Sequence, residues 1–137
     1  MRPVLSACRA AVPHIKRSGG GSIINTGSIV ARHGGGPGVS LYGGAKAFVE
    51  AVTRNLAKEF ATSGIRVNAV APGVIATPFH DRFSTAEALE NFRKMIPMAR
   101  LGTAEECVGA YLFLASESLS RYVTGQVIEV NGGQLMP

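Results

Sequence analysis

The chain has 137 residues, of which 46% are apolar and 17% are charged. This length fits one compact domain, and this composition excludes a wholly disordered chain. The formal net charge of +5 comes from lysines and arginines that are scattered along the chain, with no run of four, so nucleic-acid binding is the disfavoured interpretation.

The first residues predict a helix, a strand and a loop. Apolar residues at helical spacing predict a helix over residues 3–16, which ends at the glycines 19–21. A short run of β-forming residues predicts a strand over 22–26. Residues 31–40 are rich in glycine and predict a loop.

A longer helix and a second strand are predicted next. Apolar residues recur at helical spacing between about Ser40 and Thr62. The run over 65–70 predicts a strand that stops at Pro72-Gly73.

Two pairs of residues have the spacing of a capping box, in which two residues at a helix start cap each other's backbone. Ser84 with Glu87 predicts a short helix over about 85–94, and Thr103 with Glu106 predicts the start of another helix.

The last predicted strand covers residues 126–130. Strands that are separated by helices of crossover length predict an α/β protein with a parallel sheet of about three strands. No internal repeat or linker separates a second domain, so residues 1–137 are expected to form a single unit.

Two cysteines, Cys8 and Cys107, lie far apart in apolar helical segments and are expected to be buried, reduced thiols. No metal-ligand spacing accompanies them. The N-terminal segment is interrupted by Arg9 and Pro13 before a signal-peptide core builds up, and no segment approaches the length of a membrane span. The expectation is a cytoplasmic protein without a membrane partner.

Polar residues gather after the predicted strands, where open parallel sheets bind ligands. Ser28 follows the first strand, Pro72-Gly73 follows the second, and Tyr42 and Lys46 share one face of the intervening helix. An ammonium group favours a nearby phenolate and lowers the pKa of the phenol, so this pair can relay a proton to a substrate oxygen that Ser28 also binds. Taken singly, Ser28 reads as a turn residue and Lys46 as a solvated charge; their combined placement favours the catalytic interpretation.

The runs GSIINTGS (21–28), YGGAK (42–46), IRVNAVAPGVIATP (65–78) and YVTGQVIEVNGG (122–133) together resemble the classical short-chain dehydrogenases/reductases. The resemblance covers nearly the whole chain. It implies the C-terminal part of a doubly wound Rossmann-type sheet, without the N-terminal half that binds the dinucleotide.

The resemblance also implies a role for each site residue. Tyr42 is the general acid/base, Lys46 lowers the pKa of Tyr42 and holds the nicotinamide ribose, and Ser28 orients the substrate oxygen. The cofactor, NAD or NADP, is then bound by Tyr42, Lys46, Pro72, Gly73, Ile75 and Thr77. The substrate is a small alcohol or carbonyl compound, and the protein is a homo-oligomer, a dimer or a tetramer, in which the helix of Tyr42 packs against its copy.

Two departures from the family pattern limit these expectations. Ser28 and Tyr42 are 42 − 28 = 14 residues apart, one more than the commonest family spacing. The glycine-rich turn, the residue that selects NAD or NADP and a catalytic asparagine belong to the family's N-terminal half and have no counterpart here. The glycines 19–21 precede a strand and not a helix, so they do not replace that turn. The alternative is therefore a catalytically incompetent fragment that serves at most as an oligomerisation module.

Residues 77–98 are expected to form a lid over the substrate. Its large apolar residues can line a pocket, although plain packing is favoured for Phe92 and Met95; these residues are Phe79, Phe83, Phe92, Met95 and Met98. His33 and His80 are expected to be surface residues.

Overall fold

The computed structural model describes residues 2–78 and 84–137. Helices and strands alternate along most of the chain. In chain order they are α1 (Arg2–Arg17), β1 (Gly21–Thr26), α2 (Val30–His33), α3 (Ser40–Phe60), the 3-10 turn η1 (Ala61–Ser63), β2 (Ile65–Pro72), β3 (Ile75–Ala76), α5 (Ala86–Met95), β4 (Gly102–Thr103), α6 (Ala104–Ala115), α7 (Glu117–Ser120) and β5 (Val127–Val130).

The main sheet has three parallel strands in the order β1-β2-β5, which confirms the predicted α/β class. The central strand β2 is buried from Ile65 to Ala71, as expected for a parallel strand covered on both faces. Two of its polar side chains donate to backbone carbonyls: Arg66 to that of Leu114 at 2.8 Å, and Asn68 to that of Val123 at 2.9 Å.

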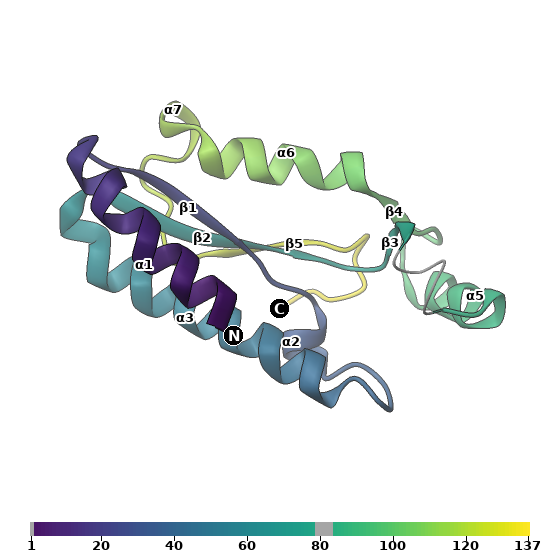
Figure 1. The fold of residues 1–137 in the computed structure, drawn as a ribbon. Helices are drawn as coiled ribbons and strands as arrows, with labels where there is room; N and C mark the ends of the chain where they lie inside the picture. Colours follow the sequence, from purple (N-terminus) through teal and green to yellow (C-terminus); the bar gives the residue numbers. More distant parts are fainter. Residues whose placement is uncertain (1, 79–83) are drawn as a thin grey trace.

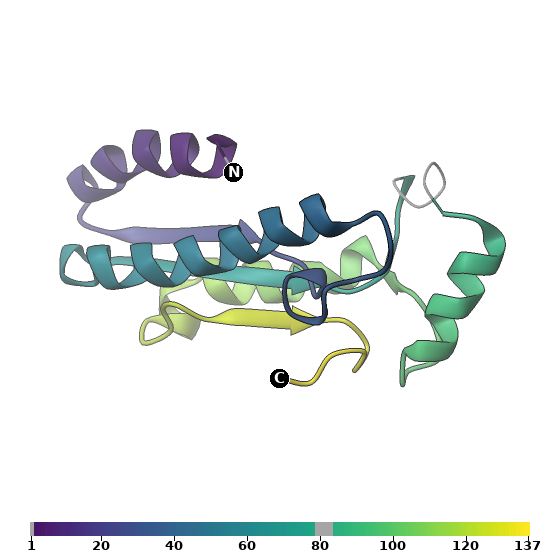
Figure 2. The same cartoon turned by 90° about the horizontal axis from the view of Figure 1, so that it is seen from below.

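Helices cover the sheet on both faces (Figures 1 and 2). α1 and α3 lie on one face, and α6 lies on the other. A buried cluster of Val12, Ala57, Ile65 and Val67 joins α1 and α3 to the central strand. α5 projects beyond the carboxyl ends of the strands, next to the short strands β3 and β4.

The structure corrects several local predictions. The predicted loop over 31–40 begins within α2, and the two-residue pair β3–β4 and helix α7 were not predicted. Elements this short carry no periodicity that a sequence pattern can reveal. The N-cap of α5 is Thr85 and not Ser84, since the Thr85 hydroxyl accepts the amide of Ala88 at 3.1 Å. The predicted capping box at Thr103 and Glu106 is confirmed.

The glycines 19–21 lie at the amino end of β1. A Cβ on Gly20 would stand 2.5 Å from the carbonyl oxygen of Gly64, so the chain needs glycine there for close packing against the start of β2. This turn is at the opposite end of the sheet from Ser28, which agrees with the expectation that it is no phosphate-binding loop.

Cys8 and Cys107 are both buried and free, as predicted, and burial raises the pKa of each thiol. Within residues 2–78 and 84–137, no helix is long and apolar enough to cross a membrane.

Candidate active site

Ser28 lies in the turn that follows β1 and is buried. Its hydroxyl accepts the amide of Val30 at 3.3 Å, and its carbonyl accepts the amide of Ala31 at 3.0 Å. The next amide, that of Ile29, donates to the carbonyl of Pro72 at 3.2 Å. These bonds join the turn after β1 to the end of β2, so Ser28 and Pro72 meet at the carboxyl edge of the sheet.

Tyr42 and Lys46 occupy neighbouring turns of α3. The Lys46 Nζ atom donates to the carbonyl oxygen of Thr26 at 2.9 Å and lies 5.7 Å from the centre of the Tyr42 ring. Tyr42 is 45% exposed, so its phenol remains accessible to a ligand. The last carbonyl of β1 therefore holds the lysine against the tyrosine.

One cavity of about 1020 Å³ lies at this edge of the sheet. All of the site residues predicted from the sequence line it: Ser28, Tyr42, Lys46, Pro72, Gly73, Ile75 and Thr77. They come from the turn after β1, from α3, and from the end of β2 and the segment that follows it, so the topology brings together residues that are far apart in the sequence.

Further residues line the same cavity and were not singled out for it. They are apolar or neutral, and include Val30, Val39, Cys107 and Gln134. His33 is exposed, as predicted, but also lines the cavity, and its ring Nδ1 accepts the amide of Gly35 at 2.9 Å. No spacing pattern in the sequence distinguishes these lining residues from ordinary loop or helix residues.

The predicted lid contributes to the cavity through Phe92 and Met95. Met95 is 57% exposed, so the prediction that its side chain only packs between two short helices is wrong. Met98 lines a different, smaller cavity. Phe79, His80 and Phe83 lie outside the described residues.

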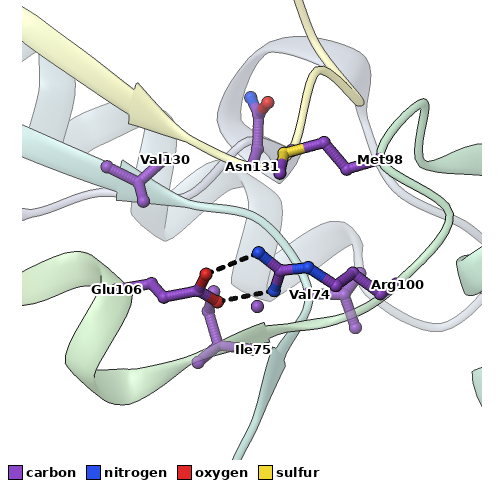
Figure 3. A pocket seen from close by; sticks show the side chains of 9 residues that line it. Val74, Ile75, Met98, Arg100, Glu106, Val130 and Asn131 are labelled. Atoms are coloured by element: carbon purple, nitrogen blue, oxygen red, sulfur yellow. Dashed lines mark hydrogen bonds and ion pairs between the residues drawn. The ribbon is translucent and has the colours of Figure 1, made fainter.

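The smaller cavity, of about 220 Å³, adjoins the first near Val74 and Ile75. Figure 3 shows Arg100 and Glu106 facing each other across it in a two-bonded ion pair, with distances of 2.6 and 2.8 Å. Glu106 also accepts the amide of Thr103 at 2.9 Å. The hydrogen bonds from Arg100 and then from Thr103 lower the pKa of Glu106 to about 2. This pair braces β4, which pairs with β3 and thereby holds Ile75 at the wall of the larger cavity.

A second charge cluster lies behind the Ser28 turn. Glu50, on α3, accepts hydrogen bonds of 3.3 Å from both Arg32 and Arg54. Arg32 also lies 3.7 Å from a carboxylate oxygen of Glu129 on β5. Burial raises the pKa of Glu129, and the nearby Arg32 opposes that rise. The cluster thus connects α2, α3 and β5.

The described residues contain no group of three or more histidine, cysteine, aspartate or glutamate side chains placed to hold a metal ion. The larger cavity is lined by a phenol, an ammonium group and a hydroxyl from the predicted site residues, and also by the His33 imidazole and the Cys107 thiol.

Comparison with known proteins identifies the family. The family model described as enoyl-(acyl carrier protein) reductase matches residues 1–134. An uncharacterized short-chain type dehydrogenase/reductase of Sinorhizobium fredii is 44% identical in an alignment of length 137 that covers 99% of this chain and 54% of that protein. The chain thus spans about half the length of the curated relatives it matches.

Solved structures agree with this match. An NADH-dependent reductase responsible for alginate metabolism, complexed with NAD, is 40% identical, with a TM-score of 0.83 over 99% of this chain and 51% of that one. A gluconate 5-dehydrogenase from Burkholderia cenocepacia, in complex with NADP and tartrate, is 31% identical, with a TM-score of 0.89 over 96% of this chain and 51% of that one. The chain belongs to the short-chain dehydrogenase/reductase family and corresponds to the C-terminal part of its Rossmann-type fold.

Proposed function

We propose that residues 1–137 form a single Rossmann-type unit that carries the catalytic and substrate-facing part of an NAD(P)-dependent oxidoreductase. The reaction is hydride transfer between a nicotinamide and a small alcohol or ketone. The observation that carries the proposal is the position of the Lys46 ammonium, which is bonded to Thr26 and lies beside the Tyr42 ring at the cavity that Ser28 also lines.

Each side chain has a defined task in this proposal. Tyr42 exchanges a proton with the substrate oxygen, and the Lys46 ammonium stabilises the negative charge left on the phenolate. The Ser28 hydroxyl donates to the same substrate oxygen. The hydrogen bond that this hydroxyl accepts from the Val30 amide holds the serine side chain in place. Ser28 and Tyr42 together fix the direction in which the reacting carbon points.

The cavity suits a nicotinamide nucleotide. A lysine ammonium has three donors, so Lys46 can bond Thr26 and still donate to ribose hydroxyls. The segment Pro72–Thr77 supplies a wall for the flat ring. The nicotinamide, when bound, supplies the hydride chemistry. Pro72, Gly73, Ile75 and Thr77 are the proposed cofactor contacts beside Tyr42 and Lys46.

The remaining parts of the proposal concern partners and compartment. The neutral and apolar lining residues Val30, Val39, Phe92 and Met95 support a small-molecule substrate. Leu41, on α3 next to Tyr42, is 91% exposed, which supports packing of this helix against a second copy. The two free cysteines support a reducing compartment such as the cytoplasm.

The test combines binding and turnover. NADH and NADPH are titrated by nicotinamide fluorescence, and oxidation of the preferred one is followed with a panel of small ketones. Both are measured on this chain and on a version extended upstream by a glycine-rich half. The Tyr42→Phe variant should retain binding and lose turnover by roughly 10²- to 10⁴-fold, the usual contribution of a general acid/base. Turnover that survives this substitution would disprove the assigned role of Tyr42.

A second candidate function is an oligomerisation module without activity. It is favoured by exposed apolar side chains outside the cavity, since Leu112 on α6, Leu119 on α7 and Tyr122 are all open to solvent. This candidate predicts a stable oligomer by light scattering together with no nicotinamide binding by either version. Binding by the extended version alone would assign the activity to the longer protein.

A further inference from the structure

We propose that Glu50 is a positioning residue, which fixes the turn that carries Ser28 relative to the helix that carries Tyr42. The proposal rests on the proposed function, since it gives Glu50 its purpose through the alignment of Ser28 with Tyr42. None of the sequence patterns pointed to Glu50, which follows Tyr42 by two helical turns and Lys46 by one.

Glu50 lies directly behind the Ser28 turn. It is only 3% exposed. A Cβ placed on Gly27 would stand 3.5 Å from the Glu50 Oε1 atom, so the carboxylate is in van der Waals reach of the residue that precedes Ser28. Tyr42, near the start of α3, thus lines the cavity, and Glu50, further along the same helix, contacts the turn that carries Ser28.

Arg32 transmits this position to Ser28. Its Nε atom donates to Glu50 Oε2 at 3.3 Å, and it belongs to α2, a helix of 4 residues whose first amides are bonded to Ser28. A helix this short is not stable alone, because the nucleation cost exceeds the gain from so few hydrogen bonds. Its position must therefore come from tertiary contacts, and its ion pair with Glu50 ties it to α3.

Glu129 also contacts this arginine: its Oε1 atom lies 3.7 Å from the same Nε atom. The guanidinium group is thus paired with carboxylates from α3 and from β5, an outer strand of the described sheet. An apolar contact of Val30 with Gly43 also joins α2 to α3, since a Cβ on Gly43 would lie 3.2 Å from the Val30 side chain. The apolar contact sets the separation of the two helices, and the ion pair sets the direction of the turn.

Stability alone does not account for this arrangement. The Oε1 atoms of Glu50 and Glu129 are buried without a hydrogen-bond partner among the described residues. Buried charges with incomplete partners destabilise a fold relative to apolar residues of the same size. A buried carboxylate that costs stability, and that links the elements carrying the site residues, fits a positioning role.

Arg54 provides a matched control. It donates to the same Glu50 oxygen at 3.3 Å, but it lies on α3 itself, so this ion pair stays within one helix. Arg54→Gln therefore removes one partner of Glu50 and leaves the link between α3 and α2 in place. Arg32→Gln breaks the link between α3 and α2 by changing its more exposed partner. It therefore provides a second variant if Glu50→Gln folds poorly.

The first experiment measures amide hydrogen exchange on the full chain and needs no activity. In Glu50→Gln and Arg32→Gln, the α2 amides of Ala31, Arg32 and His33 should exchange roughly tenfold faster or more, since a hydrogen bond to a charged group is lost. Arg54→Gln should leave these rates unchanged, and the β2 amides should stay protected in all variants. Unchanged α2 exchange in Glu50→Gln and Arg32→Gln, or equal acceleration in Arg54→Gln, would overturn the proposal.

The second experiment asks whether Glu50 acts through Ser28. Glu50→Gln should lower kcat by roughly ten- to a hundredfold, as expected for a small misplacement of a reacting group, with KM for the nicotinamide cofactor unchanged. In a Ser28→Ala background the same substitution should cause no further loss. An equal loss in both backgrounds would show a general structural effect and refute the positioning role. Absence of turnover in the unaltered chain would count against the proposed function, and the exchange rates would still decide the role of Glu50.

Discussion

The ammonium nitrogen of Lys46 lies 5.7 Å from the centre of the Tyr42 ring and 2.9 Å from the carbonyl oxygen of Thr26. The last residue of β1 thereby fixes a charge next to the phenol. Because the hydrogen-bond acceptor is a backbone atom, the position of this charge depends on the path of the strand and not on a second flexible side chain.

Replacement of Lys46 by methionine should remove the charge and keep the packing of the side-chain stem. We expect kcat to fall by roughly 10²-fold or more, because the phenolate loses its stabilising partner, and the affinity for NADH or NADPH to weaken. Steady-state kinetics and fluorescence titration measure the two effects. Lys58→Met, an exposed position near the end of the same helix, should change neither. Normal kcat in Lys46→Met would contradict the relay.

Gly73 should not tolerate a side chain. A Cβ at this position would stand 2.7 Å from the Cβ and 2.8 Å from the Cα of Asn131, and this backbone cannot move without disturbing the end of β5. Gly73→Ala should destabilise the fold by about 1–3 kcal/mol in urea denaturation.

Gly109 is the matched position for that comparison. A Cβ there, in the interior of α6, would meet nothing within 4 Å, so Gly109→Ala should stabilise the fold by about 0.5–1 kcal/mol. Equal effects of the two substitutions would contradict the close approach of Gly73 and Asn131.

The stability of the protein should depend on the ionisation of Glu129. Its pKa is raised in the fold, mainly by burial, whereas a glutamate in the unfolded chain titrates near 4.3. The protonated form is therefore favoured by folding. The associated stability is fully present below about pH 4.3 and is lost as the pH rises through the folded-state pKa. Glu129→Gln should lack this loss, so its urea midpoint should decline less between pH 4 and pH 8. Parallel pH profiles for the variant and the unaltered protein would show that this carboxyl is not perturbed.

Glu106 should have the opposite effect. Its pKa is lowered to about 2, first by the hydrogen bonds from Arg100, so the ionised form is favoured by folding. This contribution is present above about pH 4.3, the unfolded value, and is lost as the pH falls toward 2. Glu106→Gln should be less stable than the unaltered protein at pH 7, and the difference should shrink between pH 5 and pH 2.5.

The control for Glu106 is Glu59→Gln, the same change of charge at an exposed position of α3. Denaturation curves at pH 7, 4 and 2.5 compare the two variants. A difference from the unaltered protein that stays constant over this range would rule out the Arg100 pair as its source.

Sequence reasoning succeeded where the relevant spacing is local or follows from parallel strands. Tyr42 and Lys46 are one helical turn apart. Ser28 follows β1 and Pro72 ends β2, and the carboxyl ends of these parallel strands lie at one edge. These relationships need no knowledge of packing, and they located the residues that the structure brings together at one cavity. The roles of these residues remain predictions.

The features that were missed depend on tertiary structure. Arg32 pairs with Glu50 and Glu129, which lie on two other elements. No spacing in the sequence predicts this pairing. α2 is too short for periodicity, and its position follows from contacts with α3. The exposure of Met95 likewise depends on how far α5 projects from the sheet, which an apolar pattern does not encode.

The position of β1 in the sheet has a consequence for the dynamics of the site. Among the described strands, β1 is bonded to a neighbour on one side only, and its final carbonyl, that of Thr26, anchors Lys46. Outer strands open more readily than central ones, because fewer bonds must break. Any segment that pairs with the second side of β1 therefore restricts the motion of the Lys46 anchor, and by thermodynamic linkage a ligand that needs Lys46 in place strengthens that pairing in return.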